Sequence, residues 1–145
     1  MFKAILHFIG IMALAFLLIA SETRQSAEAN AAGQAFISHC ASGVTVTMSF
    51  KSETLSVYTP VDVTVRIVGA DGTPVSDALI FCSFFMPEVA TGWNKPKLKA
   101  LGKDGTYSGV VFFERDGHWL ANFTINLPSG DYEEVSFDLG TIKPA

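Results

Sequence analysis

Apolar residues recur at every second position along most of this chain after residue 43. The clearest run spans residues 61–67, where three valines and an isoleucine alternate with Asp62, Thr64 and Arg66. Adjacent residues of a β-strand point to opposite faces of its sheet. The run therefore predicts a strand with one buried face and one solvated face.

Similar runs follow one another at short intervals, separated by turns such as Asp71-Gly72 and Asp116-Gly117. Together with the first run they predict about seven strands in roughly 100 residues, with no convincing helix among them. The further runs lie at residues 44–50, 78–86, 95–99, 107–113, 119–127 and 135–139. This pattern is typical of an all-β, immunoglobulin-like antiparallel β-sandwich. Residues 95–99, with lysine at every second position and a proline among them, predict an exposed edge strand.

The N-terminal region has a different composition from the rest. A short positive start precedes an apolar run at residues 4–20, and Ala27-Glu28-Ala29 offers a small-x-small cleavage site. These features predict a signal peptide over residues 1–29, or an uncleaved membrane anchor helix if the site is not used. We expect a flexible leader at residues 30–42 and the sandwich domain at residues 43–145.

Charge and motif content exclude several classes of function. The net charge is −4 with no basic stripe, which argues against nucleic acid and against docking on anionic lipid. Contact with a membrane is expected only through an uncleaved N-terminal segment. The chain also lacks a nucleophile elbow, a metalloprotease helix motif and a phosphate loop, so we do not expect an enzyme.

Two cysteines, Cys40 and Cys82, remain after the predicted signal peptide. An even count in an exported protein makes a disulfide between them one interpretation. The alternatives are a buried apolar thiol at Cys82 and a reactive or metal-binding thiol at Cys40.

Sulfur and imidazole donors suggest a soft-metal site. Met86 precedes a proline at the end of one predicted strand, and His118 lies in a predicted turn. If the sandwich brings these ends together, Met86 and His118 would share a rim, with Met48 or a cysteine as a further donor for Cu(I). The competing interpretation is core packing for the methionines and a turn position for the histidine.

The run at residues 78–86 differs from the others because both sets of alternating positions are mostly apolar. Such a strand is either central and covered by a loop, or it exposes an apolar patch to a partner. Phe81 and Phe85 would lie on the outer face in either case. Trp93 follows in a long irregular stretch, where a large aromatic side chain is suited to anchor a protein interface.

Residues 55–127 resemble the FixH/YtkA-like family of small exported β-sandwich domains. The similarity rests on five short segments: Pro60-Val61, residues 71–78, Met86-Pro87, Gly105-Thr106-Tyr107 and Gly117-His118-Trp119. Family members often carry more methionine or histidine after the Met-Pro pair, whereas this chain has residues 88–93 without either. Among those ligands only Met86 carries over.

The resemblance implies a periplasmic or otherwise exported accessory protein that contacts another envelope protein, with links in some members to copper handling and respiratory complex assembly. Trp93, Phe81 and Phe85 are the predicted contact residues. The alternative is a periplasmic Cu(I)-binding chaperone that uses Met86 and His118. No cofactor other than copper is expected.

Overall fold

The computed structural model describes residues 33, 35–92 and 94–145 of the chain. Eight strands form in that part, and it contains no helix. Their bounds are β1 Ala35–His39, β2 Thr45–Phe50, β3 Pro60–Val68, β4 Leu79–Phe85, β5 Lys99–Ala100, β6 Thr106–Phe112, β7 Gly117–Asn126 and β8 Tyr132–Ile142. The predicted signal peptide or anchor lies outside the described residues, and no helix able to cross a membrane is found among those described.

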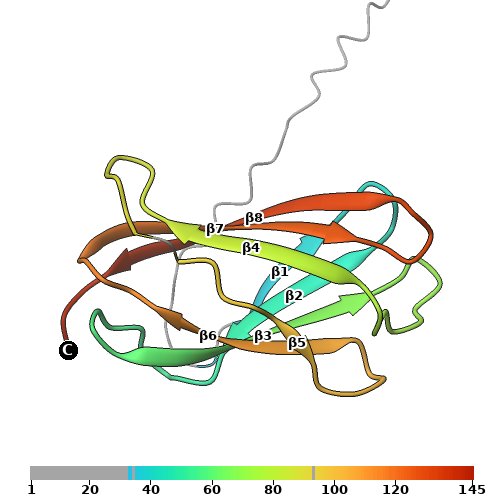
Figure 1. Cartoon of the computed structure of the whole chain (residues 1–145), viewed down its shortest axis with the longest axis horizontal. Coiled ribbons are helices and arrows are strands. Elements are labelled where there is room, and N and C mark those ends of the chain that lie inside the picture. Colours follow the sequence, from blue (N-terminus) through green and yellow to red (C-terminus); the bar gives the residue numbers. More distant parts are fainter. Residues whose placement is uncertain (1–32, 34, 93) are drawn as a thin grey trace, which may run out of the picture.

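The strands form two antiparallel sheets, one on each side of the core (Figure 1). The larger sheet has the order β1-β2-β3-β6-β5, and the smaller sheet has the order β4-β7-β8. This arrangement confirms the prediction of an all-β sandwich. It also shows that β4 is an edge strand, because β7 is its only partner in the sheet.

The predicted strands correspond to β2 through β8. One of them, β5, is shorter than predicted, and the structure has one further strand, β1. Of the expected edge strand at residues 95–99, only Lys99 pairs with β6, together with the following Ala100. The expected flexible leader is wrong for residues 35–39, which form β1 and pair with β2 in register from Ala35 to His39. Phe36 explains this difference: it is buried, and its ring contacts those of Phe50 and Phe137.

Aromatic rings fill the space between the sheets. Phe113 and Trp119 are fully buried, with ring centroids 5.1 Å apart in an edge-on arrangement. Trp119 also satisfies its indole N–H by donating to the carbonyl of Arg115 at 2.9 Å. Phe84 of β4 contacts Phe113 and Phe123, which ties the edge strand to both layers. Apolar burial of this kind is the main stabilising contribution in a sandwich of this size.

A buried tyrosine fixes the start of β4. Tyr107 of β6 is 3% exposed, and its hydroxyl donates to the carbonyl of Val75 at 2.8 Å. The same hydroxyl accepts from the amide of Ala78 at 2.9 Å. The chain therefore enters β4 held against the larger sheet.

Candidate functional site

The outer face of β4 exposes large apolar side chains. Leu79 and Phe81 are each 59% exposed, and Phe85 on the same face is half-buried. Register pairs Phe81 with Thr124 and Phe85 with Leu120 of β7, so both phenylalanines point away from the core. Of the two interpretations of this run, the structure has the exposed patch rather than a covered central strand.

The loop after β4 begins with Met86 and returns along the edge of the sandwich. Trp93, the predicted interface anchor, lies outside the described residues. Its neighbours are tethered: the amide of Gly92 donates to the Glu114 carboxylate, and the Asn94 side chain donates to the carbonyl of Phe112 at 2.7 Å. Gly92 and Asn94 are thus held near the end of β6.

Residues 94–98 then run beside β4 before they join the larger sheet. The amide of Phe84 donates to the carbonyl of Asn94 at 2.9 Å. Further along, the thiol of Cys82 donates to the carbonyl of Pro96 at 3.2 Å. In Figure 1 the segment between β4 and β5 passes from one layer to the other.

A groove of about 510 Å³ lies between the edge of β4 and this crossing segment. Its volume is within the usual range of small-ligand sites. It is lined by Ala78, Leu79, Ile80, Phe81, Cys82, Ser83, Lys95, Pro96, Lys97, Leu98, Asn122 and Thr124. The sequence showed the apolar strand and the alternating lysines but gave no sign that they face each other, so the groove was missed.

Both cysteines are free thiols in the structure, so the disulfide interpretation is not supported there. Burial raises the pKa of Cys82 to about 12, and the thiol contacts Pro96 instead of Cys40. Burial together with the nearby carboxylate of Glu133 raises the pKa of Cys40 to about 11. Neither thiol has the lowered pKa that a reactive cysteine needs.

The predicted copper ligands come from different strands and loops of the sandwich. Met48 is fully buried in β2, within the larger sheet, whereas Met86 and His118 belong to the end of the smaller one. Met86 is 9% exposed, and its methyl group packs against Gly117. His118 is the next residue, yet its side chain points to the outer face, about half exposed. Among the described residues, no group of three or more His, Cys, Asp or Glu side chains is placed to hold a metal.

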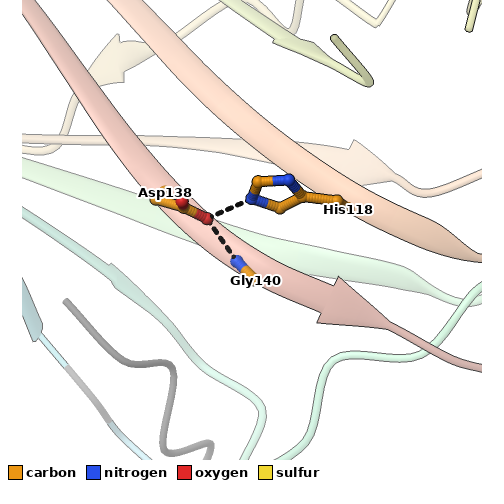
Figure 2. Close-up of polar contacts among 3 residues, drawn as sticks. All are labelled: His118, Asp138 and Gly140. Atoms are coloured by element: carbon orange, nitrogen blue, oxygen red, sulfur yellow. Dashed lines mark hydrogen bonds and ion pairs between the residues drawn. The ribbon is translucent and has the colours of Figure 1, made fainter. Parts of the chain in front are cut away.

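His118 has a structural partner instead (Figure 2). Its Nε2 lies 2.6 Å from Oδ1 of Asp138, and the same carboxylate accepts from the amide of Gly140 at 2.8 Å. The β7 and β8 register shifts between Trp119 and Leu120 at this point. Partial desolvation raises the pKa of Asp138, but the hydrogen bonds from Gly140 and His118 outweigh it, and the net pKa lies below the ordinary value. The pair thus stabilises a β-bulge.

The fold and the site define an all-β sandwich domain with an exposed apolar edge strand beside a groove. The family follows from the sequence, since a family model described as YtkA-like matches residues 40–122. This chain belongs to the YtkA-like family, which confirms the resemblance seen in its turns and strand ends.

Comparison with solved structures finds a match to the ZirS C-terminal domain. The TM-score is 0.44 at 17% sequence identity, with 95% of this chain and 86% of the other covered. No curated protein matches the chain.

Proposed function

We propose that this chain is a non-enzymatic accessory domain of immunoglobulin-like type that works by contact with another envelope protein. Family membership supports the accessory role, and the predicted signal peptide supports export to the periplasm or cell envelope. We further propose that the contact assists the assembly of a metal centre or a respiratory complex.

One observation carries the proposal of a contact surface: Leu79 and Phe81 are each 59% exposed on one strand. A sheet face that meets only water usually carries polar side chains. Exposed apolar side chains grouped on a rigid element are typical of a protein interface. Phe85 extends the same face, and we include Trp93, in the following loop, as the predicted anchor.

The test is co-purification of envelope proteins with the tagged native protein. We expect Phe81→Ser to lose the bound partner without a lower melting temperature, because the side chain contributes little to the core. Trp93→Ala is expected to have the same effect.

Leu101→Ser is the matched control, since Leu101 is 65% exposed but lies in the turn between β5 and β6. If Phe81→Ser and Leu101→Ser retain the partner equally, the proposed surface is wrong.

The alternative function, a periplasmic Cu(I)-binding chaperone, has one favourable observation. The buried thioether of Met86 lies against Gly117, one residue from the imidazole of His118. His118 is exposed on the outer face and Met86 is buried, so both donors would serve one ion only if one of these side chains turned toward the other. Titration of the reduced protein with Cu(I) against a competing chelator tests this idea. Equal affinity in the wild type and the Met86→Leu, His118→Gln double variant would contradict it.

A further inference from the structure

The backbone amides of β4 and of the residue before it point in two directions, toward β7 or away from it. The Phe84 amide donates to Asn94, away from β7, and the Ala78 amide donates to the Tyr107 hydroxyl, also away from β7. Because amide directions alternate along a strand, the amides of Ile80 and Cys82 point the same way. No hydrogen bond from either of these two amides to the described residues outside β7 is found. Their carbonyls face the same edge.

Within the described residues, the crossing segment makes no backbone hydrogen bond to these groups, although Cys82 as a whole is only 6% exposed. Beside Cys82, the segment's Pro96 carbonyl accepts from the inward-facing thiol and not from the backbone amide. The segment has therefore left the plane of the smaller sheet at this point. One residue further, the carbonyl of Lys97 and the side chain of Leu98 lie against Gly109 of β6. The groove opens where β4 and the segment diverge, in front of Ile80 and Cys82.

The groove combines an open strand edge with positive charge. Its outer rim carries the apolar side chains of Leu79 and Phe81, and its opposite wall carries the exposed Lys95 and Lys97. None of the lining residues is acidic. An occupant that is extended, forms backbone hydrogen bonds and bears carboxylates would be complementary to all three features.

We propose that this groove binds an extended acidic polypeptide segment, which adds as a strand to the outer edge of β4. The segment exchanges N–H···O bonds with Ile80 and Cys82, places its apolar side chains on Phe81, and directs its carboxylates to Lys97. Strand addition of this kind derives affinity from the main chain and specificity from alternate side chains. The inference rests on the proposed function, since it names the chemistry of the partner segment.

The first experiment uses the purified protein labelled with 15N and a capped eight-residue peptide of alternating valine and glutamate. We expect the Ile80 and Cys82 amide signals to shift, and their hydrogen exchange to slow at least tenfold on saturation. A peptide of alternating valine and lysine is expected to bind at least tenfold more weakly. Equal binding of both peptides, or no shift at Ile80 and Cys82 at millimolar acidic peptide, would overturn the proposal.

A pair of variants isolates the backbone contribution. Ile80→Pro and Ile80→Ala both remove the half-buried side chain, but only proline removes the outward N–H. Proline is tolerated on an edge strand at such a position, because the bonds to β7 come from its neighbours. We expect at least tenfold weaker binding of the acidic peptide to the proline variant than to the alanine variant. Equal affinities would exclude strand addition.

A second pair isolates the charge. Lys97→Glu and Lys103→Glu change the net charge equally, and Lys103 is exposed in the turn before β6, outside the groove. We expect at least fivefold weaker binding of the acidic peptide to Lys97→Glu and less than a twofold effect of Lys103→Glu. Equal effects would exclude recognition at the lysine wall.

The same Ile80 variants, tested by envelope co-purification, separate this inference from the proposed function. Loss of the partner in Phe81→Ser but full retention in Ile80→Pro would leave the contact surface intact and refute strand addition. Retention in both would refute the surface as well.

Discussion

Strands β3 and β4 are both rich in apolar residues, but they lie at different places in their sheets: β3 is central and β4 is at an edge. β3 lies in the middle of its sheet, with Val63, Val65 and Ile67 fully buried and Arg66 exposed between the last two. β4 lies at an edge, and its outward positions carry Leu79 and Phe81. Packing within this chain explains why the inward-facing residues of β3 are apolar. It does not explain the apolar residues on the outer face of β4, and these exposed side chains are the physical basis for proposing a partner there.

The largest difference in stability is expected between the same substitution on the inner and on the outer face of β4. Phe84 is 1% exposed and contacts three other aromatic rings, so Phe84→Ala should lower the free energy of unfolding by about 3–5 kcal/mol. Phe81→Ala should lower it by less than about 1 kcal/mol, because Phe81 already meets water. Urea denaturation measures both. Equal losses would mean that the outer face of β4 is part of the core.

The thiol of Cys82 tests whether the inner face of β4 is closed. With its pKa raised to about 12 by burial, compared with the ordinary 9.0, its thiolate fraction at pH 8 is lower by roughly a thousandfold. We expect iodoacetamide to label Cys82 only after unfolding in urea. Intact mass without reductant should also show two free thiols. A mass lower by two hydrogens, or labelling at the same rate in buffer and in urea, would contradict the structure.

Tyr107 connects the two strands, since it lies opposite Val65 of β3 while its hydroxyl holds the entry to β4. Tyr107→Phe leaves the part-buried carbonyl of Val75 and amide of Ala78 without their partner. We expect a loss of about 1–3 kcal/mol in the free energy of unfolding.

Tyr132→Phe is the control for this change, because Tyr132 is 64% exposed. The two variants should differ in calorimetric melting temperature. If they melt together, the hydroxyl of Tyr107 contributes nothing to the fold.

The smallest effect concerns Asp138, on the outer face that β4 shares with β7 and β8. Its pKa is lower in the folded protein than in the unfolded chain, so its contribution is present above the unfolded pKa and is lost as the pH falls through the folded pKa. The carboxylate is about half exposed, and solvent screening limits the effect to less than about 1 kcal/mol. Unfolding measured from pH 6 to pH 2 should show a smaller acid-induced loss in Asp138→Asn than in the wild type. An equal loss would show that the pair with His118 is not coupled to folding.

The sequence alone determined most of the strands, the turns and the family. Period-two alternation assigns each side chain to a face, because neighbouring residues of a strand must point in opposite directions. That rule located β2 through β4 and β6 through β8, and it placed Phe81 and Phe85 on one face. The glycine-containing turns between the strands carried the resemblance that the family match confirms.

Only the tertiary structure decided which strands are neighbours and which edges stay open. Sheet order depends on pairing between residues distant in the sequence, and local alternation contains no information about it. Without that information the sequence predicts a leader where β1 forms, leaves open whether β4 is central or exposed, and groups Met48 with Met86 and His118. The groove beside Ile80 and Cys82 arises from the same cause: it exists because residues 94–98 leave one sheet for the other, a change of direction that no short stretch of sequence records.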